Sequence, residues 1–454
     1  MSSLKKAFFI LLLIGLSGCE YVDDMPQAGR FIAKNICSGT FVEGFDETPL
    51  IEDYVTPFVP FIENSWQVEI NHQTQTVAVT NSIFKNIEAR ALYRPPIGCV
   101  SPLDETDEQL IQQAPIPVAE KVLDPEIPWP HGSGGASPIP GVDYDQLDQV
   151  MEDVFTPAKG INAVAFLVVY DGQLVVERYE GGIGPMSPVK GFSMSKSLIN
   201  GLIGRMQGMG LLSATDTTGI PEWADDDRAL ITLDDLMRMS SGLDFEERAT
   251  GNDNHQGQLL YGDQPPFEFA VSRPLKNQPG STFNYSSGDN IILAKIVADK
   301  LGGLQAAYDF YQTEFFHRFD AVNSLVEHDV QGHMVSAESL FMSARDWARL
   351  AQLYMNNGQW DGQQILSPDW IDYSLTPSDN FSIYGANIWL NTDQEAFPML
   401  PEDTFAFAGA LERFVMAVPS RKTIVVRLGF SHNRDEVDIN PIVAGVLQAL
   451  PGRP

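Results

Sequence analysis

The chain has 454 residues, of which 44% are apolar and 20% are charged. This composition is typical of a folded globular protein of one or two domains and excludes a wholly disordered chain. The formal net charge of −31 comes from 29 basic and 60 acidic residues. Such a charge repels nucleic acid and anionic lipid surfaces, so we expect no nucleic-acid partner.

The first residues have the pattern of an export signal. Lys5 and Lys6 precede an apolar run over residues 7–16, which is too short to span a bilayer as a stable anchor. The run ends in LSGC at positions 16–19, which resembles a bacterial lipobox. The resemblance implies removal of residues 1–18 and lipidation of Cys19, and several acyl chains on one cysteine hold a protein on a membrane surface. The alternative is an ordinary secretory signal with an incidental cysteine.

This lipid anchor implies a location in the bacterial cell envelope. Glu20, rather than aspartate, follows the lipidated cysteine. By similarity to lipoproteins of enteric bacteria, this residue favours the periplasmic face of the outer membrane.

Two cysteines, Cys37 and Cys99, remain after this processing. An exported compartment permits disulfides, and two remaining cysteines suit one bridge. Two separate buried thiols are the alternative. The sequence has no Cys-x-x-Cys pair and no histidine spacing typical of zinc sites, so we expect no metal and no cofactor.

Residues 19–100 form a first, N-terminal region. Residues 66–70 and 76–79 are apolar or alternate on either side of a short polar segment, as the strands of a hairpin do. Residues 101–143 are first acidic, then rich in proline, and then carry Gly-Ser-Gly-Gly at 132–135. This composition predicts an extended and weakly packed linker.

Residues 144–454 have the pattern of a larger α+β domain. Apolar runs over 163–169 and 174–176 flank an Asp-Gly pair, which is a strong hairpin signal. A second hairpin is predicted over 414–418 and 423–428, close to the C-terminus.

The segment between these hairpins is mostly helical in pattern. Thr232 and Ser343 are predicted N-caps of two helices, and Asn440 is the predicted N-cap of the last helix. Strands at both ends with helices between them predict one antiparallel sheet in which the first and last hairpins pair. This sheet would be flanked by helices and by an all-helical lobe.

The strongest chemical motif is Ser193-Met194-Ser195-Lys196, which precedes an apolar run of helical spacing. Residues three apart on a helix share a face, so Ser193 and Lys196 are expected to meet. A serine hydroxyl needs a base within reach to become a nucleophile, and a lysine can orient it, stabilise its alkoxide or take its proton. The alternative is an N-cap serine beside a solvated lysine. Ser195 stands where the nucleophile elbow of α/β-hydrolases needs glycine, so that fold is not favoured.

Two further segments could complete a site. Tyr285 follows a Pro-Gly turn, and a tyrosine near a lysine can act as a general base, although alone it is more often a packing residue. Gly409 stands before the last hairpin, at the expected start of an edge strand, where glycine lets a substrate carbonyl approach the backbone. The N–H groups of Ser193 and Ala410 could then form an oxyanion hole.

In this order, Ser193-x-x-Lys196, Tyr285 after its turn and the glycine-bearing last strand resemble the serine β-lactamase and penicillin-binding protein superfamily. The resemblance covers roughly residues 144–450. It looks closest to the class C-like branch, which includes esterases, D-aminopeptidases and 6-aminohexanoate-dimer hydrolases. It implies the fold of that superfamily and an acyl-enzyme on Ser193, with Lys196 and Tyr285 handling the proton.

The chain departs from the penicillin-handling members at two positions. Ser287 stands two residues after the tyrosine, where those members usually have asparagine, and Phe407 stands where lysine or histidine opens their last motif. Phe407 cannot bind a substrate carboxylate. We therefore expect an esterase or amidase acting on small substrates that lack this group. The alternatives are a β-lactamase or D-alanyl-D-alanine carboxypeptidase, and a catalytically idle surface binding protein of the same fold.

Overall fold

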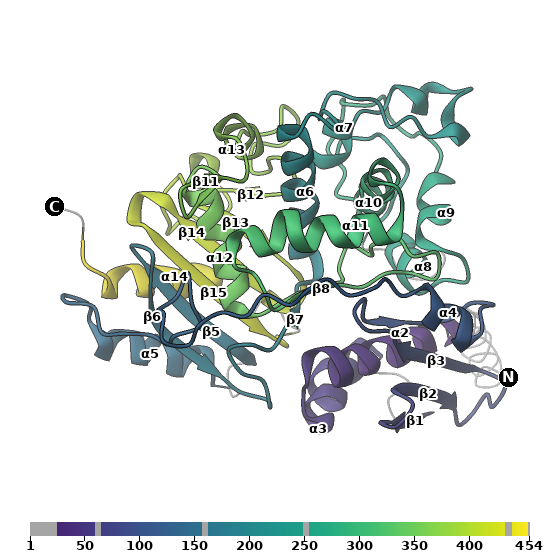
Figure 1. Cartoon of the computed structure of the whole chain (residues 1–454), viewed down its shortest axis with the longest axis horizontal. Helices are drawn as coiled ribbons and strands as arrows, with labels where there is room; N and C mark the ends of the chain where they lie inside the picture. Colours follow the sequence, from purple (N-terminus) through teal and green to yellow (C-terminus); the bar gives the residue numbers. More distant parts are fainter. Residues whose placement is uncertain (1–24, 60–64, 157–161, 248–253, 432–437, 453–454) are drawn as a thin grey trace, which may run out of the picture.

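The computed structural model describes residues 25–59, 65–156, 162–247, 254–431 and 438–452. The predicted signal, residues 1–18, and the predicted lipidation site Cys19 lie outside these ranges. Within them, no helix combines the length and the apolar character needed to cross a bilayer. Figure 1 shows a sheet with its helices on one side of the molecule, a helical lobe on the other, and the N-terminal region below the lobe.

The largest sheet combines strands from both ends of the main domain, as the sequence predicts. Its strand order is β12-β13-β14-β15-β5-β6, and β15 pairs antiparallel with β5, which joins the two predicted hairpins. Asp171 and Gly172 both have positive φ, 47° and 74°, as the tight turn between β5 and β6 requires. The strands are β5 (Ala163–Tyr170), β6 (Gln173–Tyr179), β12 (Trp389–Leu390), β13 (Phe405–Ala408), β14 (Phe414–Val418) and β15 (Thr423–Gly429).

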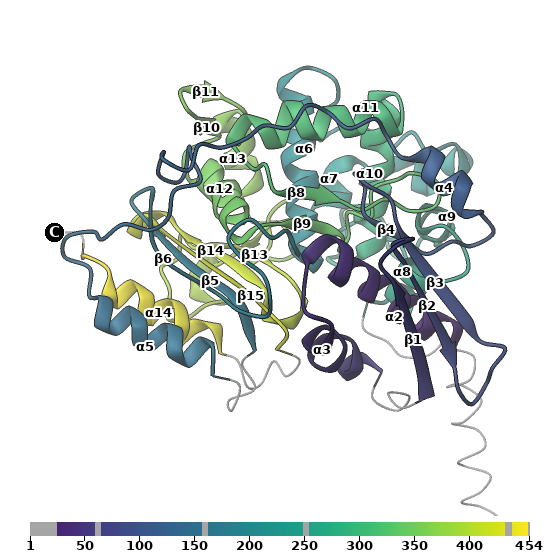
Figure 2. The same cartoon turned by 60° about the horizontal axis from the view of Figure 1, so that its bottom comes forward.

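Helices cover both faces of this sheet. Helices α5 (Tyr144–Val154) and α14 (Ile439–Ala449) lie side by side on one face, as Figure 2 shows, and α12 (Ala344–Met355) packs on the other. Burial from both sides explains why β14 and β15 are apolar along nearly their whole length. The N-cap of α14 is Asp438 rather than the predicted Asn440, because the Asp438 carboxylate accepts the Asn440 N–H.

The helical lobe surrounds α6 (Lys196–Gly208), whose residues are almost all buried. Thr232 and Ser343 are N-caps, as predicted, and each side chain accepts the N–H of the residue three positions later. A small sheet of order β7-β9-β8 connects the lobe to the main sheet. The remaining elements are β7 (Val189–Lys190), α7 (Leu233–Met237), α8 (His255–Tyr261), α9 (Pro266–Val271), α10 (Ser287–Leu301), α11 (Leu304–Asp309), β8 (Ser324–Val326), β9 (Leu340–Met342), β10 (Gln359–Trp360), β11 (Gln363–Gln364) and α13 (Pro368–Ser374).

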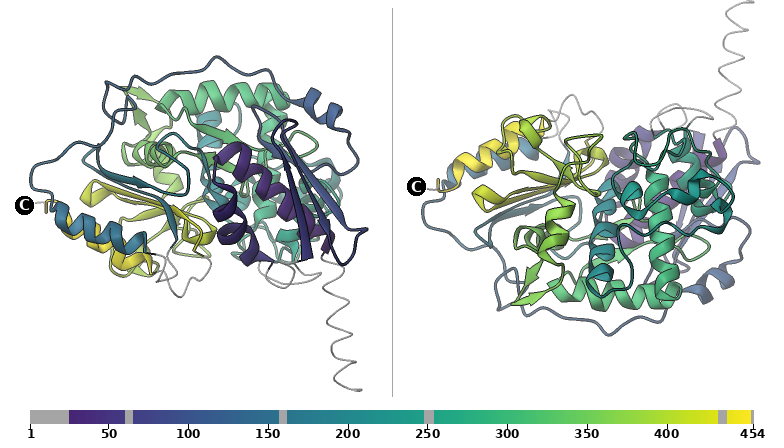
Figure 3. Two further views of the ribbon diagram at one scale, coloured as in Figure 1. Left: turned by 90° about the horizontal axis from the view of Figure 1, so that it is seen from below. Right: turned by 90° about the horizontal axis from the view of Figure 1, so that it is seen from above.

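The N-terminal region is a helix packed on a four-stranded antiparallel sheet, and it lies against the helical lobe (Figure 3). Its predicted hairpin is present as β1 and β2, whereas its helix α2 was not predicted. Short helical turns follow α2 and end at Phe58. The main elements are α2 (Met25–Ser38), α3 (Glu47–Pro49), β1 (Trp66–Asn71), β2 (Thr76–Asn81), β3 (Glu88–Tyr93) and β4 (Cys99–Val100).

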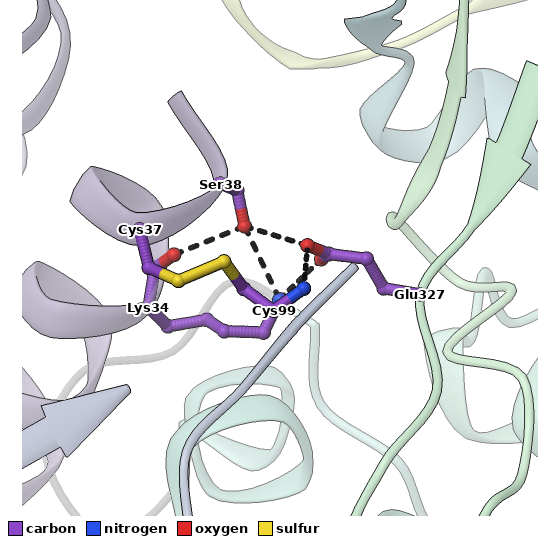
Figure 4. Close-up of a disulfide and its surroundings, with 5 residues drawn as sticks. All are labelled: Lys34, Cys37, Ser38, Cys99 and Glu327. Atoms are coloured by element: carbon purple, nitrogen blue, oxygen red, sulfur yellow. Dashed lines mark hydrogen bonds and ion pairs between the residues drawn. A yellow bond between two sulfur atoms is a disulfide. The ribbon is translucent and has the colours of Figure 1, made fainter. Parts of the chain in front are cut away.

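A disulfide joins Cys37 on α2 to Cys99 on β4, the pairing that the sequence predicts. It lies beside the buried carboxylate of Glu327 from the main domain (Figure 4). Glu327 forms an ion pair with Lys34 and accepts hydrogen bonds from Ser38 Oγ (2.7 Å) and from the Cys99 N–H (2.9 Å). A buried carboxylate that loses such partners is costly, so these contacts hold the N-terminal region on the main domain.

The segment 101–143 runs mostly extended along the outside of the molecule (Figure 3), but the expectation of weak packing is wrong in two places. Residues Asp107–Gln113 form the capped helix α4. Further along, Trp129 is buried, and the guanidinium of Arg349 donates to the carbonyl of Pro130 (2.9 Å). Arg345 likewise donates to the carbonyl of Ser133 (2.7 Å), and composition alone does not show that one tryptophan and two arginines anchor such a segment.

Candidate active site

The candidate nucleophile lies in a tight turn between β7 and α6. Ser193 is the second residue of a 3₁₀ turn over Phe192–Ser195 that leads directly into α6. Phe192 has a positive φ of 49°, a strained conformation of the kind that clusters at functional sites. Gly191 leaves no room for a side chain, since a Cβ there would lie 2.4 Å from Cζ2 of Trp347. The turn therefore presents Ser193 at a helix N-terminus, where the dipole favours developing negative charge.

Lys196 is buried directly beside Ser193. Its Nζ lies 3.1 Å from Ser193 Oγ, 3.2 Å from Ser287 Oγ and 3.0 Å from the carbonyl oxygen of Ala337. Three acceptors match the three donors of an ammonium group. In the neutral amine, the lone pair could instead accept the Ser193 proton. The predicted meeting of Ser193 and Lys196 is thus present, although a 3₁₀ turn rather than an α-helix carries Ser193.

Tyr285 lies immediately before α10 and faces Lys196. Lys196 Nζ is 4.9 Å from the centroid of the Tyr285 ring. The ring stacks on Trp389 at 5.8 Å between centroids and meets Tyr384 edge-on at 6.0 Å. These aromatic contacts fix its position, so the fold brings together three residues that span 93 positions of the chain, from Ser193 to Tyr285.

Glu247 is part of the same cluster and was not predicted. Its Oε1 accepts a hydrogen bond from Ser287 Oγ (2.5 Å), and its Oε2 accepts the Ser287 N–H (3.0 Å). Gln256 Nε2 also donates to Oε1 (2.9 Å). A polar chain therefore runs from Lys196 through Ser287 and Glu247 to Gln256. No spacing in the sequence distinguishes Glu247 from the preceding Glu246, which carries the same carboxylate but is exposed.

Gly409 and Ala410 lie beside the nucleophile turn. A Cβ on Gly409 would be 2.3 Å from the carbonyl oxygen of Gly191, so only glycine lets these two segments come this close. Gly409 follows β13, which is the second strand from the edge of the sheet, and not the start of an edge strand as expected. Within the described residues, neither the Ser193 nor the Ala410 N–H donates to another protein atom. The two groups are therefore available for an oxyanion.

Two residues considered from the sequence do not reach this site. Phe407, expected at a substrate-binding position, is only 1% exposed and packs against Tyr354 at 5.7 Å between ring centroids, so it offers a substrate no surface. Ser195 is fully buried, and its Oγ accepts the Leu340 N–H (3.0 Å). Phe407 is thus a core residue, and Ser195 has a structural hydrogen bond.

The backbone before Ser193 is also tied to the N-terminal region. Lys190 Nζ donates to Asn35 Oδ1 (3.0 Å) and to Glu338 Oε1 (2.7 Å), and the Lys190 N–H donates to Glu43 Oε1 (2.8 Å). Burial would raise the pKa of the Glu338 carboxyl, but the charge and hydrogen bond of Lys190 hold it below its usual value. Glu338 directly follows Ala337, whose carbonyl contacts Lys196. The N-terminal region and the main domain therefore meet next to the residues that hold Lys196 and Ser193.

The fold is that of a hydrolase family. The family model described as beta-lactamase matches residues 146–439, and the chain belongs to this family. The family and its neighbours are hydrolases of the β-lactamase fold, which confirms the predicted fold class.

The chain is similar to several individual members. The 6-aminohexanoate-dimer hydrolase of Paenarthrobacter ureafaciens is 25% identical over 243 residues, which span 50% of this chain and 59% of that protein. A structure named "Putative 6-aminohexanoate-dimer hydrolase from Bacillus anthracis" has a TM-score of 0.58 at 20% identity, covering 77% of this chain and 97% of that one. A class C beta-lactamase has a TM-score of 0.53 at 13% identity, covering 70% and 100%. At these identities the two structures show the fold alone.

Proposed function

We propose that this protein is a serine hydrolase that cleaves ester or amide bonds of small substrates through an acyl-enzyme on Ser193. The observation that carries the proposal is the 3.1 Å contact between Lys196 Nζ and Ser193 Oγ, beside the Ser193 and Ala410 N–H groups that are available for an oxyanion. Membership of a hydrolase family supports it.

In the proposed reaction, Ser193 Oγ attacks the substrate carbonyl and forms a tetrahedral intermediate. The hydroxyl proton passes to the pair formed by Lys196 and Tyr285, and the carbonyl oxygen takes the negative charge. The N–H groups of Ser193 and Ala410 stabilise that oxyanion. The leaving group departs with the proton. A water molecule then attacks the acyl carbonyl and gives a proton to the same pair. The bond to Ser193 Oγ breaks, Oγ takes this proton back, and the acid is released.

The environment of Phe407 favours an esterase or amidase over a β-lactamase or a D-alanyl-D-alanine carboxypeptidase. Phe407 fills the core where the penicillin-handling enzymes that the sequence resembles have a cation, and so provides no partner for a substrate carboxylate.

We also propose that the mature protein begins at Cys19 and is anchored by lipid in the bacterial cell envelope, on the periplasmic face of the outer membrane. The lipobox-like sequence at 16–19 supports this. Cys19→Ser should release the protein from the membrane fraction in cells. A variant that stays in the membrane pellet would argue against the anchor.

The enzymatic proposal is tested on the purified mature chain with three reagents. A fluorophosphonate probe should label the protein, 4-nitrophenyl acetate should be hydrolysed, and nitrocefin should be turned over at least about a hundredfold more slowly in kcat/KM. Absence of both labelling and ester hydrolysis would favour the idle binding protein, and preferential turnover of nitrocefin would favour the β-lactamase.

A further inference from the structure

A pocket of about 320 Å³ lies beside the candidate nucleophile turn, between the main domain and the N-terminal region. Phe192, the residue before Ser193, and Ala410, the candidate oxyanion donor, both line it. Gln256 lines it as well and is hydrogen-bonded to Glu247, which places the pocket at the end of the polar chain from Lys196. The pocket therefore adjoins the reaction centre.

The N-terminal region supplies one wall of this pocket. Gln27, Ala28 and Phe31 from α2, and Phe58 and Val59 at the end of the short helical turns after α2, face residues of α8 across it. The Phe31 ring contacts both the Phe58 ring and the ring of Tyr261 edge-on, each at 5.2 Å between centroids. These three rings form a continuous aromatic wall that neither region builds alone.

The chemistry of the lining favours an uncharged, apolar group. The described lining residues include no lysine or arginine, and their one carboxylate, Glu338, is already paired with Lys190 and with the Tyr261 hydroxyl. Besides Glu338 and the Tyr261 hydroxyl, the polar side chains of the described lining are the amides of Gln27, Asn254 and Gln256. Phe58 is 43% exposed, so an apolar group bound in the pocket would cover aromatic surface that is now open to solvent.

On the basis of the proposed function, we propose that this pocket binds an apolar, uncharged acyl chain of the substrate and that the N-terminal region is an integral part of the substrate-binding site. A volume of about 320 Å³ is at the lower end of the usual range for small-molecule sites and suits a medium-length chain. The ion pair at Glu327 and the bonds of Lys190 hold the wall in place.

The test is a series of 4-nitrophenyl esters from acetate to hexanoate. Because each buried CH₂ contributes roughly 0.8 kcal/mol, kcat/KM should rise about fourfold per added carbon. A chain of the same length that ends in a carboxylate should lose this gain. Hydrolysis of acetate with no dependence on chain length would overturn the pocket assignment and leave the serine hydrolase intact, whereas no hydrolysis and no probe labelling would mean that the function itself is wrong.

Two variants of the N-terminal wall test whether this wall causes the dependence of kcat/KM on acyl-chain length. Ala28→Trp should fill the pocket and reduce the ratio of hexanoate to acetate kcat/KM at least about tenfold, and Phe58→Ala should reduce it about threefold to tenfold. Ile83→Ala is the matched control, since Ile83 is a 70% exposed residue of the same region that does not line the pocket, and the ratio should stay unchanged.

A second ester series separates the acyl side from the leaving-group side. Acetates of alcohols of increasing size are compared in the wild type and in Ala28→Trp. If Ala28→Trp changes how kcat/KM depends on the size of the alcohol, and not how it depends on the length of the acyl chain, the acyl assignment is overturned. An unchanged hexanoate-to-acetate ratio in both wall variants, with normal thermal unfolding, would show that the N-terminal region is not part of the site.

Discussion

Glu247 holds Ser287 by two hydrogen bonds, one from the Ser287 hydroxyl (2.5 Å) and one from its backbone N–H (3.0 Å). Since the same hydroxyl lies 3.2 Å from Lys196 Nζ, the carboxylate determines which lone pairs of Ser287 are directed at the lysine. In this way Glu247 positions Lys196 without touching Ser193.

Glu247→Gln should therefore lower kcat by about tenfold to a hundredfold with little change in KM for 4-nitrophenyl acetate, because proton handling rather than binding is impaired. Glu246→Gln is the matched control, because that neighbouring carboxylate is exposed. A pH profile of kcat that changes shape in Glu247→Gln but not in Glu246→Gln would distinguish this positioning from a general loss of stability. Equal, full activity in both variants would contradict it.

The Cys37–Cys99 disulfide should contribute substantially to stability. It closes a loop with a sequence separation of 62. In the chain-entropy model such a loop corresponds to about 4 kcal/mol. Replacing both cysteines by alanine should lower the free energy of unfolding in urea by up to that amount. Two freely alkylated thiols in the unreduced protein would show that the bridge does not form.

Asp289 gives a prediction for pH. Burial raises the pKa of its carboxyl from 3.8 to about 8, and its one hydrogen-bonded oxygen accepts from Ser241 (2.8 Å). The folded state therefore binds this proton more tightly than the unfolded state. The resulting stabilisation is complete below about pH 4 and is lost as the pH rises to about 8, at roughly 1.4 kcal/mol per pKa unit.

Asp289→Asn should flatten this dependence and raise stability at pH 8, as measured by urea unfolding at pH 5 and pH 8. Asp299→Asn, at the exposed end of the same helix, is the control and should leave the pH dependence as it is. A wild-type protein as stable at pH 8 as at pH 5 would contradict the prediction.

Phe407→Lys should destabilise the protein and should not create a carboxylate-binding site. The substitution removes a core aromatic side chain, worth about 3–5 kcal/mol, and buries an unpaired charge. Phe407→Leu should cost much less, on the order of 1.5 kcal/mol. A stable Phe407→Lys variant that gains activity on a carboxylate-bearing ester would show that the side chain at this position reaches the substrate.

Much of the fold was predictable because local signals carried it. The Asp171-Gly172 turn, the caps Thr232 and Ser343, and the pairing of the first and last hairpins all follow from residues close in sequence or from simple sheet topology. The contact between Ser193 and Lys196 was predictable for the same reason, since a spacing of three positions along a helical turn brings them together.

The rest depends on contacts between distant segments. Glu247 reaches Ser287, 40 positions away, and Glu327 reaches Lys34, 293 positions away, and no periodicity encodes either pair. Burial of Phe407 depends on its contact with Tyr354 of α12, the helix that packs on this sheet, so the motif position alone misplaced Phe407 at the substrate. The pocket wall was missed because it forms only where α2 docks on α8.

The most direct test of the account compares fluorophosphonate labelling of Ser193→Ala and Ser195→Ala. Ser193 is partly exposed and contacts Lys196, whereas Ser195 is fully buried and hydrogen-bonded to the Leu340 N–H. Labelling and ester hydrolysis should disappear in Ser193→Ala and persist in Ser195→Ala. Labelling that survives in Ser193→Ala but is lost in Ser195→Ala would contradict the assignment of the nucleophile and, with it, the proposed mechanism.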